Sequence, residues 1–467
     1  MAVLANSALS SRQRLGIILV AALGLRLLIL MMTTGLSLRI VDEQQYHVLA
    51  TSIVEGRGFA STSGPTSLRP PVYPALVAGL WTLTGSRSLQ VVRAFQDLLG
   101  LATAALVYFI GRRLYDDRAG LIAAALTAFY PELVLNNSLF LTETVFTFLL
   151  AAFVATMLSL LQRPRPALAL AGGTLLGLSA LTRSVVWPFP IVLVPLVAWT
   201  APTTMARRLA CAGLVLAGYA VVVAPWAVRN TRLQGMPVVI DTMGGMNLRM
   251  GNYEFTPHDR IWDAVSQRGA QSWIVGLPPH PPGGGEWTEG WKERWAREQA
   301  IAFMREHPGL TLWRAVIKFS DFWALDRDFA AAMQRGLYRP PLWAAVVATA
   351  AITVAFPLVI GLAIIGACLK PPADWRSHLL LILLVVFVTA LHSVVFSHPR
   401  YRLPLTPVLA VYAGAAVSAG AWHRLREGWR VALLPVALAA TLAAMWTIQF
   451  FVRDWPFVRH LLDGPLS

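Results

Sequence analysis

Charged residues are scarce in this sequence, and cysteine is scarcer still. Only 13% of the 467 residues are charged, whereas 56% are hydrophobic and the mean hydropathy is +0.58. A soluble domain carries about 25% charged residues, so this composition excludes a soluble protein and indicates an integral membrane protein. The two cysteines, Cys211 and Cys368, both lie inside apolar runs. Packing therefore suits them better than a disulfide framework.

Nucleotide-binding motifs are also missing. The sequence contains neither a P-loop nor a dinucleotide fingerprint, which leaves ATP-driven chemistry without support. The net charge of +15 is high enough to suggest nucleic acid, but its distribution argues against that partner. Much of the charge lies in short loops between apolar runs, as the positive-inside rule expects of a membrane protein. We therefore expect no nucleic-acid partner.

Long apolar runs are what the sequence has in abundance. A spanning helix needs about 20 mostly apolar residues, and the runs predict about eleven spans. They lie near 15–36, 88–111, 119–135, 141–162, 167–183, 185–200, 209–228, 341–367, 378–397, 404–422 and 431–452. The shorter run 72–83 follows prolines and predicts an interfacial or re-entrant helix. The expected fold is an all-α polytopic membrane protein.

The order of these runs divides the chain into three parts. Residues 1–228 form an N-terminal transmembrane module with a first outer loop at 37–87, and residues 341–467 form the C-terminal transmembrane helices. Between them, residues 229–340 are rich in Trp, Arg, Gly and Pro and predict a small extramembrane segment. Within it, residues 290–305 have the pattern of an amphipathic helix that lies along the membrane surface.

The arginines set the expected orientation. Alternate loops carry basic pairs such as Arg112 with Arg113 and Arg163 with Arg165, whereas residues 131–141 carry none. The positive-inside rule then places the N-terminus inside, and the first outer loop and residues 229–340 outside. We expect a multi-pass protein of the cell inner (plasma) membrane, with its active site facing the periplasm or the exterior.

Two adjacent acids, Asp42 and Glu43, follow the first apolar run. Carboxylates at a bilayer surface are costly, so acids placed there are often functional. This pair has the chemistry of a general base or of ligands for a divalent cation. The alternative is a solvated helix start, because acids favour helix N-termini. The identity of any metal stays open, since the nine histidines show no metal-site spacing.

A third acid, Glu143, stands at the start of an otherwise apolar run and on the same expected side as Asp42. An acid in a membrane segment predicts a functional site. The alternative is an N-terminal helix acid with Thr142 as the cap. Glu143 is therefore a candidate second acidic site.

Three arginines on the outer side are candidates for holding a phosphate. Arg69 precedes two prolines, and bidentate contact with a phosphate head group is typical of arginine; interfacial snorkelling is the alternative. Arg400 and Arg402 lie in an outer loop where the positive-inside rule disfavours them. An anionic ligand explains them, and pairing with Asp42 or Glu43 is the alternative.

Taken together, the motifs resemble the superfamily C (GT-C) glycosyltransferases that use polyprenyl-phosphate sugars. The pattern is most similar to bacterial protein-mannosyltransferase-like and aminoarabinose-transferase-like enzymes. The motifs are Asp42-Glu43-x-x-Tyr46, Arg69-Pro70-Pro71-x-Tyr73-Pro74, Leu141-Thr142-Glu143, Leu181-Thr182-Arg183, Ala224-Pro225-Trp226-x-x-Arg229-Asn230, Gly244-Gly245-x-Asn247-Leu248 and Arg400-Tyr401-Arg402-Leu403-Pro404. The resemblance runs from about residue 15 to residue 420.

The resemblance implies a GT-C fold, with Asp42 as the catalytic carboxylate, Glu143 as the second acidic site and Arg69 on the donor phosphate. It also implies a substrate cavity, whose expected residues are Tyr46, Tyr73, Arg183 and Tyr401. The implied activity is inverting transfer of one sugar from a polyprenyl-phosphate donor to a lipid, glycan or protein acceptor. Transfer of a whole oligosaccharide is less favoured, because the outer segment is modest. Donor, acceptor and membrane lipid are the expected partners.

Two other classes of function remain as alternatives. A transporter or flippase of a lipid-linked or anionic substrate is the main one. Secondary transporters often show internal repeats with matching broken spans; no such repeat is evident here, and the candidate residues gather on one side of the membrane. The second alternative is a non-catalytic assembly subunit, against which the Asp42 motif argues.

Overall fold

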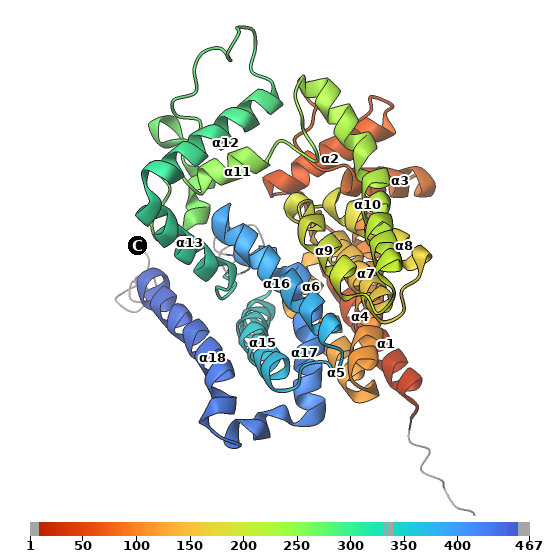
Figure 1. The fold of residues 1–467 in the computed structure, drawn as a ribbon. Helices are drawn as coiled ribbons and strands as arrows, with labels where there is room; N and C mark the ends of the chain where they lie inside the picture. Colours follow the sequence, from red (N-terminus) through yellow and green to blue (C-terminus); the bar gives the residue numbers. More distant parts are fainter. Residues whose placement is uncertain (1–8, 328, 330–332, 334–339, 456–467) are drawn as a thin grey trace, which may run out of the picture.

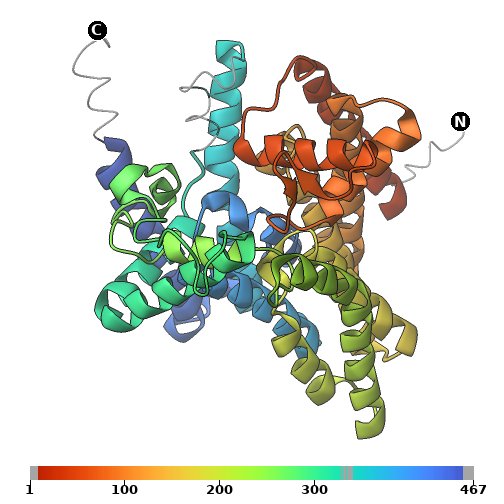
Figure 2. The ribbon, with the colours of Figure 1, turned by 90° about the horizontal axis from the view of Figure 1, so that it is seen from above.

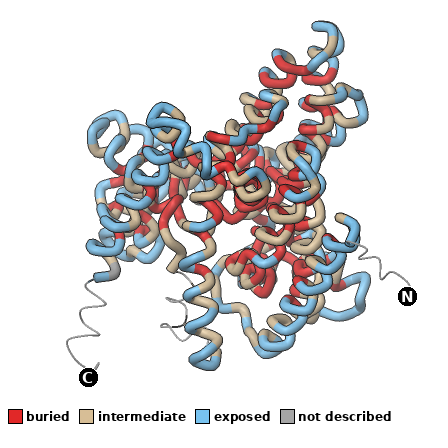
Figure 3. The backbone as a smooth tube through the Cα atoms, turned by 90° about the horizontal axis from the view of Figure 1, so that it is seen from below, coloured by how far each residue is buried: buried red, intermediate tan, exposed pale blue. Residues whose placement is uncertain are grey.

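The computed structural model describes residues 9–327, 329, 333 and 340–455, and this part of the chain is built from helices. Its strands are one short antiparallel pair, β1 (Ala60–Ser61) and β2 (Gly64–Pro65), within the first outer loop. Figure 1 shows a bundle of long helices with shorter ones gathered over one end. Buried residues concentrate at its centre (Figure 3). The expected all-α membrane fold is confirmed.

Eight helical segments in the described part are long and apolar enough to cross a membrane. They are α1 (Ser11–Met32), α4 (Leu89–Leu114), α7 (Glu143–Gln162), α10 (Met205–Gln234), α15 (Leu342–Leu369), α16 (Trp375–Val394), η4 with α17 (Pro399–Leu405 and Thr406–Ala419) and α18 with η6 (Trp429–Gln449 and Phe450–Asp454). The three remaining apolar runs form the shorter helices α5 (Asp117–Ala128), α8 (Pro166–Ala180) and α9 (Pro190–Thr200). Every predicted run therefore contains a helix, although the run near 119–135 is interrupted after Ala128. The count of eleven spans stays a prediction.

Proline and glycine set several of the helix ends. Pro166 and Pro190 occupy first-turn positions of α8 and α9, where the missing N–H costs nothing. Gly85 and Gly235 follow α3 (Val72–Thr84) and α10 with φ of 65° and 67°. A left-handed residue ends a helix, and glycine adopts that conformation without strain. The predicted interfacial helix at 72–83 is thus α3.

Glycine also lets the long helices touch closely. A Cβ on Gly366 of α15 would lie 2.0 Å from the Tyr412 carbonyl oxygen of α17, and one on Gly173 of α8 would lie 2.0 Å from the Val215 carbonyl oxygen of α10. Small residues at such crossings allow the backbones of membrane helices to pack directly. The hydrophobic effect gives little drive inside a bilayer, so this close packing stabilises the bundle.

Replacing Gly366 with alanine is expected to destabilise the protein by about 1–3 kcal/mol, because an extra methyl group at this contact must move the backbone of α17. Gly361 lies on the same helix with nothing within 4 Å of an added Cβ. Gly361→Ala is therefore the matched control and should leave stability unchanged or raise it slightly. Thermal unfolding of the purified variants measures both. Equal midpoints for the two would contradict this account of the α15–α17 contact.

The outer segment contains α11 (Gly244–Met250), η2 (Ile261–Ser266), η3 (Gly269–Gln271), α12 (Glu289–Glu306) and α13 (Pro308–Phe322). The predicted amphipathic helix at 290–305 is α12. In Figure 1 these helices lie at the same end as α2 (Val41–Val54) and α3. Figure 2 shows the two groups side by side over this end, so the outer segment and the first loop share one face of the bundle.

The first outer loop is fastened to α10 and α12. The Ser67 N–H donates to Glu289 (2.6 Å), the Ser67 hydroxyl donates to Asn230 (3.0 Å), and the Arg229 guanidinium donates to the Thr66 carbonyl (2.6 Å). These contacts explain why α10 continues to Gln234, six residues beyond the expected end of the N-terminal module at 228. They also fix the chain immediately before Arg69.

Candidate active site

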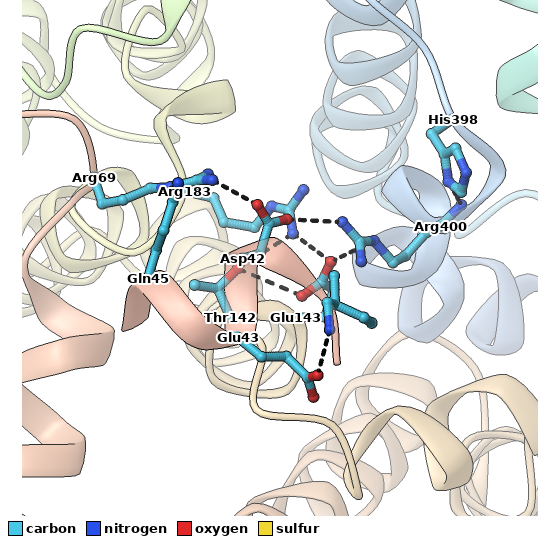
Figure 4. Close-up of polar contacts among 10 residues, drawn as sticks. Asp42, Glu43, Gln45, Arg69, Thr142, Glu143, Arg183, His398 and Arg400 are labelled. Carbon is cyan, nitrogen blue, oxygen red and sulfur yellow. Dashed lines mark hydrogen bonds and ion pairs between the residues drawn. The ribbon is translucent and has the colours of Figure 1, made fainter. Parts of the chain in front are cut away.

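Asp42 lies in the first turn of α2, and its carboxylate is held between two arginines (Figure 4). Oδ1 accepts from Arg69 Nη2 at 2.5 Å, and Oδ2 accepts from Arg400 Nη2 at 3.3 Å. Arg69 comes from the first loop and Arg400 from η4, 331 positions later in the chain. The alternative of pairing between Arg400 and Asp42 is therefore confirmed. These contacts leave the Asp42 side chain 26% exposed, so it remains within reach of a ligand.

Glu43 points away from these arginines in Figure 4. It is 3% exposed, and its carboxylate accepts the N–H groups of Arg39 (3.0 Å), Ile40 (3.0 Å) and Phe140 (2.9 Å). Three backbone donors on one carboxylate fix the start of α2 against the segment before α7. Glu43 is thus a buried acid at a helix start, not the solvated one of the alternative, and it does not pair with the arginines of Asp42.

Glu143, the first residue of α7, completes the cluster. It is 2% exposed, and Oε1 pairs with Arg183 Nη1 (2.7 Å) and Arg400 Nε (3.0 Å). Thr142 precedes α7 but makes no side-chain cap bond to its backbone. Arg400 therefore links the two acids, which come from α2 and α7. We call Asp42, Arg69, Glu143, Arg183 and Arg400 the charge cluster.

The electrostatics of the cluster favour anions. Burial alone would raise the pKa of Asp42, but the charges of Arg69, Arg400 and Arg183 outweigh it and hold the pKa below its ordinary value. The neighbouring arginines therefore stabilise the ionised form of Asp42. Within the cluster, three guanidinium groups face two carboxylates. Arginine therefore predominates, and guanidinium groups bind anions.

Arg402 does not join the charge cluster, which corrects the expectation that it binds the donor phosphate. It is 1% exposed, pairs with Glu132 at 3.3 Å and donates to the Phe322 and Ala324 carbonyls. Its guanidinium also lies over the Phe356 ring at 3.7 Å. Arg402 thus ties η4 to α6 (Pro131–Asn136), the end of α13 and α15.

The tyrosines expected in the substrate cavity have different environments. Tyr73 is fully buried and donates to Gln96 at 2.8 Å, and Tyr46 is 5% exposed with its ring edge against Tyr73. Tyr46 and Tyr73 are therefore packed against each other in the interior. The Arg69 guanidinium lies 5.5 Å from the Tyr46 ring centre. Tyr401 is half-buried below Arg183, whose guanidinium lies 5.2 Å from its ring centre. Tyr401 therefore borders the charge cluster.

Sequence reasoning missed two supports of the site. The Gln96 amide donates to the Asn137 and Leu139 carbonyls (2.7 and 2.8 Å) and thereby holds the segment before α7. Gln96 is a polar residue inside a span, and such a residue indicates a functional site as a buried acid does. Asp241, in the loop before α11, acts on the charge of Arg69. Nothing in its local sequence pointed to that contact.

The donor set fits a divalent cation poorly. Within the described residues, no three His, Cys, Asp or Glu side chains gather where they could hold a metal ion. The oxygens of Asp42 and Glu143 face guanidinium groups instead.

Comparison with known proteins gives a family match for part of the sequence and a match for the fold. Residues 68–228 match the family model described as dolichyl-phosphate-mannose-protein mannosyltransferase. The oligosaccharyltransferase of Archaeoglobus fulgidus aligns with 95% of this chain at a TM-score of 0.52 and 15% sequence identity. The fold is the GT-C fold. The resemblance expected from the motifs is thereby confirmed.

The matched regions set the limits of this likeness. The family model includes Arg69, Glu143 and Arg183, while Asp42 precedes it and Arg400 follows it. The chain spans 55% of the archaeal enzyme, about half of its length. ArnT from Cupriavidus metallidurans aligns with 86% of this chain and 77% of its own, at a TM-score of 0.41 and 15% identity. No curated protein sequence matches the chain.

Proposed function

We propose that this protein is an inverting membrane glycosyltransferase that moves a single sugar from a polyprenyl-phosphate donor to a lipid, glycan or protein acceptor. The observation that carries the proposal is the charge cluster, in which a partly exposed carboxylate lies between arginines. A phosphate-linked sugar needs both kinds of group. The family model matched by residues 68–228, whose description names a dolichyl-phosphate sugar, supports the same donor class.

In the proposed reaction, Arg69 and Arg400 bind the donor phosphate at the membrane surface while the polyprenyl chain stays in lipid. Asp42 takes the proton of the acceptor hydroxyl as its oxygen attacks the anomeric carbon from the face opposite the phosphate. The bond between that carbon and the phosphate oxygen breaks, and the polyprenyl phosphate leaves with the electron pair. The arginines stabilise the charge that develops on it. A single displacement inverts the anomeric centre.

The position of the acids favours this reaction over transport. Asp42 lies in the first turn of α2, and Glu143 is the first residue of α7. Both therefore lie at helix ends, whereas the substrate sites of secondary transporters lie near the bilayer midplane. With the orientation expected from the arginine distribution, these ends face the periplasm or the exterior. The same orientation places residues 229–340 outside, over the site.

Arg69→Ala is expected to weaken donor binding by about ten- to a hundredfold, because it removes a charge-assisted contact to the phosphate. The control is Arg57→Ala in the same loop, since Arg57 is 56% exposed and pairs with Glu55; it should bind donor as the wild type does. Binding of a fluorescent polyprenyl-phosphate sugar to purified protein measures both variants. Unchanged affinity in both Arg69→Ala and Arg400→Ala would refute the phosphate site.

A further inference from the structure

We propose that the Asp42 carboxylate occupies the place on Arg69 and Arg400 that the donor phosphate takes, and that donor binding releases Asp42 to act as the base. This inference rests on the proposed function and adds an order of substrate binding to it. The donor must bind before the acceptor hydroxyl can be activated.

The geometry is that of a bridging anion. Oδ1 of Asp42 meets Arg69 and Oδ2 meets Arg400, so the two oxygens of one group span two guanidinium groups. Two oxygens of a phosphodiester make the same kind of contact with arginines. A carboxylate engaged in this way is a weak base, because both guanidinium groups stabilise its charged form. The contacts that would bind the donor therefore also suppress the basicity of Asp42.

The arginines have second anchors that do not depend on Asp42. Arg69 Nε donates to Gln45 Oε1 at 2.8 Å, and Arg400 Nε pairs with Glu143 at 3.0 Å. Each guanidinium can thus keep its position while its Nη2 atom changes partner. Glu143 serves as the fixed anion, because its side chain is only 2% exposed. The side chain of Asp42 is 26% exposed, and its carboxylate is the one that exchanges.

The charge of the phosphate also agrees with an exchange. A phosphodiester carries one negative charge, the same as the carboxylate that it would replace on Arg69 and Arg400. With the phosphate on Arg69 and Arg400, the field at Asp42 becomes less positive and its affinity for a proton rises. Asp42 can then accept the proton of the acceptor hydroxyl. Base strength is coupled in this way to the presence of the sugar donor.

The test is the affinity of Asp42→Asn for undecaprenyl phosphate at neutral pH. Removing the competing charge should tighten binding by about tenfold or more, since the ion pairs of the carboxylate with Arg69 and Arg400 no longer have to break. Asp241→Asn is the control, because it also removes one negative charge near Arg69. In the wild type, Oδ1 of Asp241 accepts a hydrogen bond from the Met243 N–H (3.0 Å). This variant should change affinity by about threefold at most, through the screened field alone.

The outcomes separate this inference from the proposed function. If the wild type binds undecaprenyl phosphate and transfers sugar while Asp42→Asn binds it equally or more weakly, the exchange is wrong and the glycosyltransferase stands. If the wild type neither binds undecaprenyl phosphate nor transfers sugar, the proposed function fails, and the exchange fails with it. Tighter binding by Asp42→Asn beyond that of Asp241→Asn supports the exchange.

A measurement on the wild type covers the case in which Asp42→Asn does not fold. The acid limb of the pH profile of kcat reports the pKa of the base in the donor complex. The acid limb of the profile of kcat/KM for the donor reports the pKa of the base in the free enzyme. The limb of kcat should lie at the higher pH; coinciding limbs would contradict the exchange. The ionisable groups that act on Asp42 are Arg69, Arg183, Arg400, Glu143, Tyr46 and Tyr401.

Discussion

Asp42→Asn is expected to lower the rate of sugar transfer by about 10²–10⁴-fold, the usual loss when a positioned general base is removed. Asparagine keeps the shape of the side chain and can still accept a hydrogen bond from Arg69, but it cannot take the acceptor proton. The effect should fall on kcat, because the donor phosphate still finds Arg69 and Arg400. Initial rates with a labelled polyprenyl-phosphate sugar measure it.

Glu43→Gln is the comparison variant for this prediction. Glu43 is buried on three backbone N–H groups, and glutamine can accept only part of that set. We expect a lower unfolding temperature and a smaller loss of rate than in Asp42→Asn. Turnover near that of the wild type in a folded Asp42→Asn variant would remove Asp42 from the reaction. Glu143 would then be the next carboxylate to consider.

Arg402→Ala is expected to reduce the free energy of unfolding by about 3–5 kcal/mol, because it leaves the buried carboxylate of Glu132 without its partner. Arg402 and Glu132 are 1% and 6% exposed, and the Phe322 and Ala324 carbonyls lose a donor in the same variant. Arg424→Ala is the control, since the Arg424–Glu427 pair is about half exposed. It should cost less than about 1 kcal/mol.

Denaturant unfolding of the purified variants in detergent distinguishes the two arginines. The double variant Arg402→Met with Glu132→Leu should recover much of the loss, because it removes both charges from the interior. If Arg402→Ala unfolded like the wild type but lost donor affinity, Arg402 would belong to the phosphate site after all. The original expectation for this residue would then be restored.

The scarcity of charge made much of the candidate site predictable. In a chain with few charged residues, Asp42, Glu143, Arg69 and Arg400 each stood out as costly groups beside apolar runs. Their motif order then indicated the superfamily. All four lie in the charge cluster, although their roles in binding and catalysis remain predictions.

Neighbouring charged residues were harder to tell apart. Successive helix positions point in different directions, and only the fold decides which of them meets the arginines. Asp42 faces the cluster, whereas Glu43 turns to the backbone of residues 39, 40 and 140. Arg400 and Arg402, both on the short helix η4, likewise point to different partners. Spacing along the chain could not resolve either pair.

Long-range contacts set the other limit on what could be predicted from the sequence. Asp241 acts on Arg69, and Gln96 holds the segment before α7. Gln96 stands out as a polar residue inside a span, but the local sequence identifies neither its partners nor those of Asp241. The number of spans was uncertain for a related reason. Helices α5, α8 and α9 have only 12, 15 and 11 residues, and apolarity alone does not say whether helices of this length cross a bilayer of about 30 Å.

The most direct test of the central claim is turnover of a lipid-linked sugar by the reconstituted protein. Wild-type protein in liposomes would be given a panel of polyprenyl-phosphate sugars, each labelled in the sugar, with lipid, glycan and peptide acceptors. For at least one pair, we predict release of free polyprenyl phosphate and appearance of the label in the acceptor with the inverted anomeric configuration. Asp42→Asn should show neither. Donors that stay intact across the panel, while label moves across the bilayer, would contradict the account and favour a transporter.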